Sequence, residues 1–498
     1  MKNPFITELL EHDRFLGLTF DDVSLVTQYA DFLPNEANIS TQFSRNIKLN
    51  IPFVSAAMDT VTESAMAIIM ARLGGIGVIH KNMTSEEQAH QVSRVKHHSN
   101  GLIQSPITFN AEDTVFDILE TKETKRYPFS GFPIVDNNGK VVGIFTAKDM
   151  KFASDKSSKI KDVMTSEIIT APEGTNLQQA YKIMIQHKIG KLPVVNSNGE
   201  LKGLYSFHDV DALNSDSMKV VNLDEKYQLR VAAAMSPYDF ERADLLINAG
   251  VDALVLDTAH GHSKGVIETV KELKNKYTGV DIIAGNIGTE EAAADLVKAG
   301  ADGVKVGIGP GSICTTRVVA GVGIPQISAV YLASKGTAGE IPVIADGGIK
   351  QSGDVAKAIA VGANSVMMGS LLAATEESPG EKIIHQGRRF VVYRGMGSLE
   401  AMKAGQGSKE RYSQGDITDP SQLVPQGVEG RVPFRGGAAT VLHQFAGGLK
   451  FSLGYCGAKD IETFQKTAKL TKVSPAGLRE AHPHDIQIIR DAPNYRTM

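Results

Sequence analysis

The chain has 498 residues, more than a single packed core usually holds, so we expect two or more domains. Lys and Arg total 52 against 56 for Asp and Glu, and the net charge of −4 provides no basic field that would attract nucleic acid. Two cysteines, an N-terminus without a secretory apolar core and no apolar run near the roughly 18 residues of a membrane span indicate a soluble cytoplasmic protein.

Eight short apolar runs predict buried strands, at residues 52–56, 76–80, 230–234, 253–257, 281–285, 303–307, 342–346 and 365–369. Continuous apolar runs are expected when helices cover both faces of a parallel sheet. Helix-like stretches at 240–248, 290–298 and 353–360 each run into a glycine suited to a helix C-terminus. The pattern favours an α/β fold of the (β/α)8 (TIM) barrel type. An open doubly wound sheet is the alternative, although no Gly-x-Gly-x-x-Gly motif follows the first strand.

Roughly 150 residues separate the second run from the third, and they contain a repeat with a period of 60: residues 132–144 match 192–204. Each copy predicts a strand, an Asn-Gly hairpin, a second strand and an Asp (Asp149, Asp209) at a helix start. The pattern resembles a tandem pair of cystathionine-β-synthase-type (CBS) modules, a Bateman domain, over residues 96–212. The resemblance implies a purine nucleotide ligand, whereas a scaffold that binds nothing is the alternative, since both Asp residues could simply cap helices. The barrel would then comprise residues 1–95 and 213–498.

The loop after the sixth predicted strand carries Cys314 between Gly-Pro-Gly-Ser and Thr-Thr-Arg. Glycines let backbone amides and carbonyls approach a ligand, and a thiol in such a turn can be ionised by nearby donors and a cation. We interpret Cys314 as a nucleophile beside an anion site. A small buried cysteine in an ordinary turn is the alternative.

Other chemically active residue types also follow predicted strands, where barrel active sites are built. They are Met58, Asp59, Asp257, Thr258, Asn286, Asp346, Gly347, Gly348, Gly369 and Ser370.

The order of these features resembles the inosine 5′-monophosphate (IMP) dehydrogenase family over nearly the whole chain, through stretches at 18–23, 80–83, 257–263, 307–317, 345–349 and 480–485. The resemblance implies oxidation of IMP to xanthosine 5′-monophosphate (XMP), the committed step of guanine nucleotide synthesis, with NAD⁺ taking hydride. Cys314 would form a covalent thioimidate that water hydrolyses. Arg411 would activate that water, an unusual role for a guanidinium, with Tyr412 and Thr316 beside it. Arg411 and Tyr412 would belong to a mobile flap within residues 390–440.

The resemblance also assigns binding residues. The substrate would be bound by Ser312, Asp346, Gly347, Gly348, Gly369, Ser370, Tyr393, Arg394, Gly395, Met396, Gly397 and Gln426. NAD would be bound by Asp257, Asn286, Gly307, Ile308 and Gly309. A potassium ion would be held by carbonyls of Gly309, Gly311 and Cys314, with Glu480, Ala481 and His482 contributed by a neighbouring subunit. A homotetramer is implied, and octamers through the Bateman pair are a further option.

One residue departs from the bacterial pattern: Gln426 stands where bacterial members usually carry Glu. Two other functions are open. GMP reductase shares the barrel and the cysteine loop but lacks the Arg-Tyr flap, and a nucleotide-sensing protein without catalytic activity would act through the Bateman pair alone.

Overall fold

A computed structural model describes residues 16–98, 102–103, 106–124, 131–153, 155–207, 210–211, 220–490 and 492–495. The chain divides into two compact units. The barrel unit comprises Met1–Lys96, Val220–Asp224 and Leu229–Met498, and the inserted unit comprises His97–Lys219 and Glu225–Gln228. The first unit includes every predicted strand of the barrel, and the second includes the predicted repeat.

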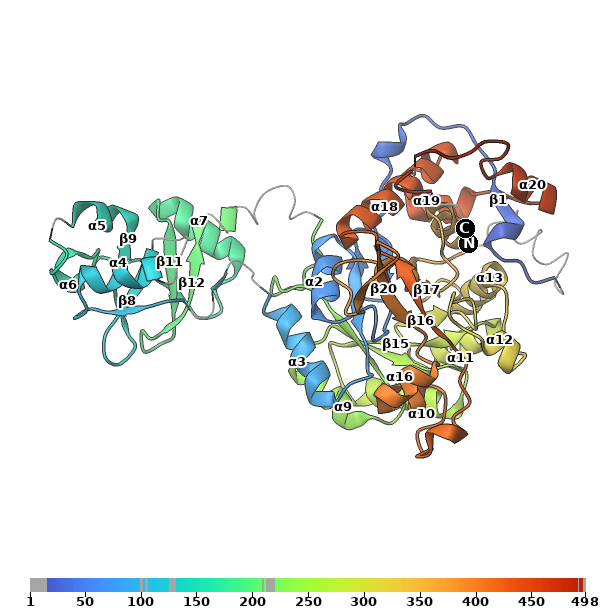
Figure 1. The fold of residues 1–498 in the computed structure, drawn as a ribbon, viewed down its shortest axis with the longest axis horizontal. Helices are drawn as coiled ribbons and strands as arrows, with labels where there is room; N and C mark the ends of the chain where they lie inside the picture. Colours follow the sequence, from blue (N-terminus) through green and yellow to red (C-terminus); the bar gives the residue numbers. More distant parts are fainter. Residues whose placement is uncertain are drawn as a thin grey trace. The chain divides into compact units, whose positions relative to one another are not determined.

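Eight parallel strands close into a barrel (Figure 1). In barrel order they are β13 (Ala232–Met235), β14 (Ala253–Asp257), β15 (Asp281–Ile287), β16 (Gly303–Val306), β17 (Val343–Asp346), β18 (Ser365–Met368), β4 (Phe53–Ser55) and β5 (Ile76–Ile79). The (β/α)8 prediction is therefore confirmed and the open-sheet alternative is excluded. The third strand begins two residues later than predicted, because the Arg230 amide donates to the Asn222 carbonyl (3.0 Å) rather than to a barrel strand.

Helices surround the barrel strands (Figure 1). They are α2 (Ser64–Arg72), α3 (Ser85–Lys96), α9 (Phe240–Asn248), α10 (Lys264–Lys276), α11 (Glu290–Ala299), α12 (Thr316–Val319), α13 (Gln326–Thr337), α14 (Ser352–Ala360) and α15 (Ser370–Ala373). The three helices predicted from sequence match α9, α11 and α14 to within a residue. Each is followed by a glycine with positive φ: Gly250 (+89°), Gly300 (+97°) and Gly362 (+112°). Glycine adopts this left-handed conformation readily because it has no Cβ.

A three-stranded antiparallel sheet extends from the end of the barrel and was not predicted. Its strands are β19 (Lys382–His385), β20 (Arg388–Arg394) and β21 (Glu429–Pro433). The segment between β20 and β21, residues 395–428, contains α16 (Leu399–Ala404), α17 (Gln406–Arg411) and η4 (Pro420–Gln422). We call it the flap segment.

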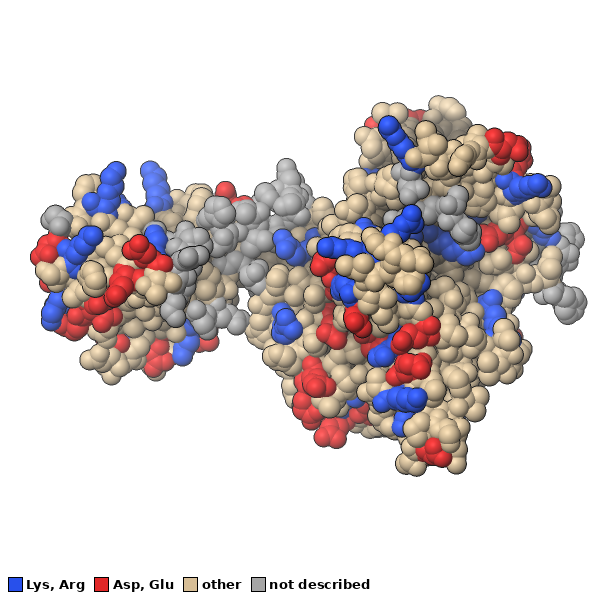
Figure 2. Space-filling view, in the orientation of Figure 1, with Lys and Arg blue, Asp and Glu red and all other residues tan. Residues whose placement is uncertain are grey.

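The first and last described segments of the chain pack beside the barrel. They form β1 (Val23–Leu25) paired with β22 (Leu470–Lys472), the hairpin of β2 (Thr41–Gln42) and β3 (Lys48–Leu49), the turns η1 (Phe20–Asp22) and η2 (Pro34–Glu36), and the helices α18 (Ala438–Tyr455), α19 (Ile461–Thr467) and α20 (Pro475–Glu480). On the face shown in Figure 2, acidic and basic side chains are interspersed over the barrel unit. Within the described part of the chain, no helix combines the length and apolarity of a membrane span.

The inserted unit contains two similar halves. One has β7 (Phe109–Asn110), β8 (Gly131–Val135), β9 (Val141–Thr146), α4 (Val115–Thr124), α5 (Ala147–Phe152) and α6 (Ile160–Val163); the other has β6 (Leu102–Ile103), β10 (Ala171–Pro172), β11 (Lys191–Val195), β12 (Leu201–Ser206) and α7 (Leu177–His187). Both hairpins turn at a left-handed glycine, Gly139 (φ +79°) and Gly199 (φ +82°). Each half has its own hydrophobic core. Asp149 caps α5 by accepting from the Thr146 amide (2.7 Å), whereas Asp209 lies outside the described residues.

The chain leaves the barrel unit at the end of α3 and returns through Val220–Asp224. Lys96, the last residue of α3, is buried, and its Nζ lies 2.8 Å from carboxylate oxygens of both Asp224 and Asp252. Asp252 immediately precedes β14, so this ion triad lies at the amino-terminal ends of the barrel strands. It ties the departing and returning chains to the barrel.

Candidate active site

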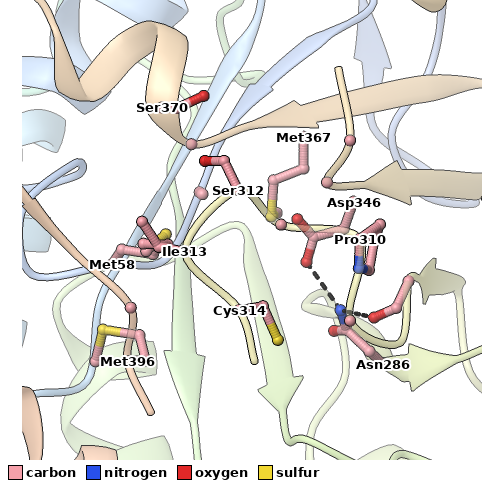
Figure 3. Close-up of a pocket in the computed structure, with 18 of the residues that line it drawn as sticks. Met58, Asn286, Pro310, Ser312, Ile313, Cys314, Asp346, Met367, Ser370 and Met396 are labelled. Carbon is pink, nitrogen blue, oxygen red and sulfur yellow. Dashed lines mark hydrogen bonds between the residues drawn. The ribbon is translucent and has the colours of Figure 1, made fainter. Parts of the chain in front are cut away.

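A cavity of about 460 Å³ lies at the carboxyl-terminal ends of the barrel strands. A volume in this range is typical of small-molecule sites. It brings together the following predicted residues: Cys314, Thr316, Arg411, Tyr412, Ser312, Asp346, Gly347, Gly348, Gly369, Ser370, Tyr393, Gly395, Met396, Gln426, Asp257, Asn286, Gly307, Ile308, Gly309 and Gly311. Figure 3 shows Cys314 and Ser312, both on the loop after β16, and Asp346, at the end of β17, around this space.

The Cys314 thiol is half-buried and belongs to a short chain of hydrogen bonds. Its Sγ donates to Thr316 Oγ1 (3.2 Å), and the Thr316 hydroxyl donates to Gln426 Oε1 (3.0 Å). Gln426 is held in place by the backbone, since the Thr315 amide donates to the Gln426 carbonyl (3.0 Å). The cysteine loop is thus paired with the returning end of the flap segment. Arg317 donates to the carbonyls of Ile308 (3.0 Å) and Ile324 (2.6 Å) and so stabilises the loop.

Serines and glycines from the loops after β16, β17 and β18 line one part of the cavity. Figure 3 shows Ser312 and Ser370 with their hydroxyls on the same side of the pocket. Gly347 (φ +93°) and Gly348 (φ +82°) have left-handed backbones that suit glycine. Burial raises the pKa of the Tyr393 phenol above its usual value, so its hydroxyl stays a neutral donor. Backbone amides and hydroxyls of this kind bind anions.

Lys305 is a site residue that the sequence analysis missed. It lies on β16 with only 1% of its side chain exposed, and its Nζ is 2.9 Å from Asp257 Oδ1 and 2.8 Å from Asp346 Oδ2. It also donates to Asn286 Oδ1, while Asn286 Nδ2 donates to Asp346 Oδ2 (3.0 Å). A single ammonium group thus bridges the buried carboxylate of Asp257 and the partly buried carboxylate of Asp346 at the base of the cavity. A lysine inside an otherwise apolar strand was the signal that could have revealed it.

Arg411 reaches the cavity from the flap segment, at the end of α17. Its Nη1 forms an ion pair with Asp257 Oδ2, and its carbonyl accepts from the Ala259 amide (3.1 Å). Its Nε is buried and has no hydrogen-bond partner among the described residues. The flap segment therefore covers the cavity in this structure, with the guanidinium on the carboxylate at the end of β14.

Tyr412 is buried beside Arg411, and burial raises the pKa of its phenol. Its ring packs on Gly397, where a Cβ would lie 2.6 Å from the ring. Gly397 is one of the predicted substrate residues, but it lies outside the described lining of the cavity and instead makes room for this ring.

Lys81 links the barrel to the flap segment through hydrogen bonds. It is buried, and its Nζ donates to the Asp257 carbonyl (2.9 Å) and to Ser236 Oγ (2.9 Å). The Ser236 hydroxyl in turn donates to Glu410 Oε2 (2.6 Å) on α17. Burial, reinforced by the nearby Arg411 charge, lowers the pKa of Lys81 to about 7.

The remaining predicted residues lie elsewhere. Arg394 is outside the described cavity lining and donates instead to Asp59, from Nη2 to Oδ2 (2.8 Å). Glu480, Ala481 and His482 lie at the end of α20, where His482 Nδ1 is 3.0 Å from the Tyr495 hydroxyl. Among the described residues, His, Cys, Asp and Glu form no group of three suited to a metal ion.

The fold and the cavity define a (β/α)8-barrel enzyme with a loop-borne cysteine at the strand ends. The family model for the IMP dehydrogenase / GMP reductase domain matches residues 17–484. The chain therefore belongs to the IMP dehydrogenase / GMP reductase family, and the resemblance inferred from the motifs is confirmed.

Curated relatives share about half of their residues with the chain. It is 51% identical over 487 residues to an inosine-5′-monophosphate dehydrogenase of Staphylococcus saprophyticus, covering 96% of the chain and 98% of that protein. The corresponding enzyme of Bacillus subtilis is 49% identical over 483 residues, covering 96% of the chain and 98% of that protein. Among solved structures, a variant of Trypanosoma brucei GMP reductase in complex with guanosine 5′-monophosphate is similar at 38% identity with a TM-score of 0.81, covering 95% of the chain and 98% of that protein.

Proposed function

We propose that the chain oxidises IMP to XMP, with NAD⁺ accepting hydride and water supplying oxygen. The observation that carries the proposal is the presence of Arg411 and Tyr412, from the flap segment, in the same cavity as the thiol of Cys314. A reaction that ends in hydrolysis needs a group to activate water near the covalent bond. These two residues are suited to that task. Relatives that share half of the sequence are named for this activity.

The lining offers complementary groups for each part of the substrate. Hydroxyls and amides around Ser312, Gly348 and Ser370 suit a phosphate dianion. The Asp346 carboxylate can accept from two ribose hydroxyls, and Lys305 and Asn286 fix its orientation. The backbone of Gly395 and Met396, together with Gln426, would face the purine edge.

Cys314 would add to C2 of the hypoxanthine ring, converting that electron-poor carbon into a saturated centre. When NAD⁺ is bound, its nicotinamide supplies the acceptor for the hydride that leaves C2. The purine is then held as a thioimidate. Water adds to C2 and gives a proton to Arg411, which is in its neutral guanidine form at this step. The carbon–sulfur bond then breaks to release XMP, and the proton on Arg411 passes to the sulfur to restore the thiol. The balance is IMP, NAD⁺ and water to XMP, NADH and a proton.

The residues proposed for NAD fit a ribose: Asp257 is a strand-end carboxylate acceptor, and Asn286 and the Gly307–Gly309 backbone line the cavity beside it. Asp257 is also the partner of Arg411. One carboxylate cannot hold both a ribose and the guanidinium, so the cofactor and the flap segment would use Asp257 in turn. Alternation would separate hydride transfer from hydrolysis.

We also propose a potassium ion at the carbonyls of Gly309, Gly311 and Cys314, completed by Glu480, Ala481 and His482 of a neighbouring subunit in a homotetramer. Carbonyl-rich loops suit a weakly charged cation. The inserted unit, with its paired hairpin modules, would bind a purine nucleotide. Replacing potassium by lithium in the assay tests the first proposal, and equilibrium dialysis of purine nucleotides tests the second.

One assay separates the candidate functions. NADH formation at 340 nm from IMP and NAD⁺ supports the dehydrogenase, whereas NADPH consumption with GMP would support the reductase. Absence of both, in protein that still binds nucleotide, would support a sensor. We expect NADH formation, because Arg411 and Tyr412 meet the requirement for water activation.

A further inference from the structure

Asn82 belongs to the stretch at residues 80–83 that the sequence analysis singled out, and the proposed reaction assigns it no role. It follows β5 and is only 9% exposed. Its side-chain amide makes three hydrogen bonds. Oδ1 accepts from the Ser408 amide (3.1 Å), and Nδ2 donates to the Ala401 carbonyl (3.1 Å) and to Asp59 Oδ2 (2.8 Å). Two of the three partners belong to the flap segment, one on α16 and one on α17.

The flap segment is shaped to approach this site closely. A Cβ at Gly405 would come within 3.0 Å of Asn82 Oδ1, and a Cβ at Gly407 would come within 3.0 Å of the Lys81 carbonyl oxygen. The contact at Gly407 is with backbone, which a real Cβ does not tolerate, so that position requires glycine. At Gly405 a Cβ would instead meet the side-chain amide of Asn82, with the Asn82 carbonyl oxygen at 3.1 Å. The backbone of the flap segment therefore rests directly on Lys81 and Asn82.

The orientation of Asn82 is fixed by its third partner. Asp59 is an acceptor, so it selects the Nδ2 side of the amide and leaves Oδ1 for the Ser408 amide. Asp59 is itself held by Arg394, the last residue of β20, through Nη2 (2.8 Å) and Nε (3.1 Å). A single network thus joins the start of the flap segment, the barrel and both flap helices.

Ser408 lies three residues before Arg411 on α17, which is about one helical turn. Fixing the Ser408 amide therefore fixes the point from which Arg411 reaches Asp257. Asn82 itself is outside the described lining of the cavity. We propose that Asn82 is a positioning residue that docks the flap segment over the cavity and so controls the water-dependent half of the reaction.

The inference rests on the proposed dehydrogenase function, and a pair of variants tests it. Asn82→Ala removes the dock at the carboxyl end of β5. The matched control is Asn222→Ala, because Asn222 is also a buried asparagine and donates to the Gly75 carbonyl (2.9 Å) just before the same strand. Stopped-flow absorbance measures NADH formation in the first turnover and in the steady state.

We expect Asn82→Ala to keep the first-turnover rate within about threefold of wild type, since hydride transfer does not need the contact between Arg411 and Asp257 that Asn82 helps to position. The steady-state rate should fall roughly ten- to thirty-fold, the effect of losing two neutral hydrogen bonds on the closed population. Asn222→Ala should leave the ratio of the two rates unchanged. A parallel fall of both rates in Asn82→Ala, or an unchanged steady-state rate, overturns the proposal.

A second readout does not depend on activity. Trypsin should cleave the flap segment after Lys403 or Lys409 faster in Asn82→Ala than in wild type, and not faster in Asn222→Ala. Equal cleavage of wild type and Asn82→Ala overturns the docking role. If wild type forms no NADH from IMP, the proposed function fails while the cleavage comparison still tests the dock.

Gly407→Ala changes the flap segment instead of the barrel residue on which it packs. This variant therefore tests the proposal if Asn82→Ala does not fold. Its Cβ would collide with the Lys81 carbonyl, and the flap segment could not seat. The same selective loss of steady-state turnover is expected. Full steady-state activity in Gly407→Ala would refute the docking geometry.

Discussion

Replacing Lys305 with Met tests whether one buried ammonium group holds the base of the cavity together. Methionine keeps the length and apolar stem of lysine but removes the charge. Lys305 is 1% exposed and bridges Asp257 and Asp346, so the substitution leaves two carboxylates without their shared cation. Asp257 is 3% exposed and is the last residue of β14, so its carboxylate in particular is left without compensation by water.

The expected loss of unfolding free energy depends on which partners Asp257 and Asp346 keep in the variant. Removing one partner of a buried ion pair typically costs about 3–5 kcal/mol, because the other charge is left uncompensated. Asp257 keeps Arg411, and Asp346 keeps the Asn286 amide at 3.0 Å, so the cost should not double. We therefore expect Lys305→Met to lose about 3–5 kcal/mol, a large part of the roughly 5–15 kcal/mol that stabilises a folded protein.

The chain has no tryptophan, so urea unfolding is best followed by far-ultraviolet circular dichroism. With a slope of about 1–3 kcal/mol per molar urea or somewhat more for a large barrel, the midpoint should fall by about 1 M or more. The control is Lys459→Met, whose partner Asp31 lies at 3.2 Å but where both side chains are about 60% exposed. Its midpoint should barely move. Equal shifts in the two variants would refute the reasoning, and partial recovery in Lys305→Met with Asp346→Asn would support it.

Four further outcomes are expected. Cys314→Ala should abolish NADH formation while calorimetry still detects IMP binding, because the anion-binding groups do not involve sulfur; residual turnover would contradict covalent catalysis. Arg411→Ala should keep the first burst of NADH and lose about 10²–10⁴ in steady turnover, the usual contribution of a general base; loss of the burst would count against that role. Gln426→Glu should retain turnover within about tenfold, because a carboxylate oxygen can accept the Thr316 hydrogen bond as the amide oxygen does at 3.0 Å; a collapse would show that the amide nitrogen matters. The pKa of Lys81 falls from 10.5 to about 7 on folding, so between these pH values the unfolded chain binds a proton that the folded chain does not. The free energy of unfolding is therefore highest above about pH 10.5, decreases as the pH falls, and reaches its lower limit below about pH 7. The unfolding free energies of wild type and Lys81→Met should therefore diverge by about 1.4 kcal/mol per pH unit between pH 7 and 9, and parallel profiles would contradict the lowered pKa.

The barrel could be predicted because its strands are buried on both faces and therefore appear as apolar runs. β14 is an example: all five residues are buried, including Asp257 at its end. The positions of Cys314 and Asp346 at the cavity follow directly, since residues after parallel strands converge at one edge. Arg411 was predicted only through the family resemblance, because nothing local distinguishes an arginine at a helix end from a surface charge.

The rest depends on contacts between residues far apart in the chain. Lys305 was missed because a lysine in a strand is normally exposed, and only the fold brings Asp257 and Asp346 to its ammonium group. The pairing of Val23 with Lys472 and the bond from Asn82 to Ser408 have no local pattern. The family resemblance assigned Arg394 to the substrate, and no local pattern indicated that its side chain pairs with Asp59.

The Lys96 triad has an evolutionary consequence. The inserted unit joins the barrel where α3 ends and Val220–Asp224 returns, at the edge opposite the strand ends that carry the cavity. Barrel loops at the amino-terminal edge contribute to stability rather than chemistry. A module can therefore be gained, exchanged or lost at this junction by descendants of the gene without rebuilding the catalytic loops, provided that the buried lysine keeps an acidic partner. Selection on regulation and selection on catalysis can then act on separate parts of one chain.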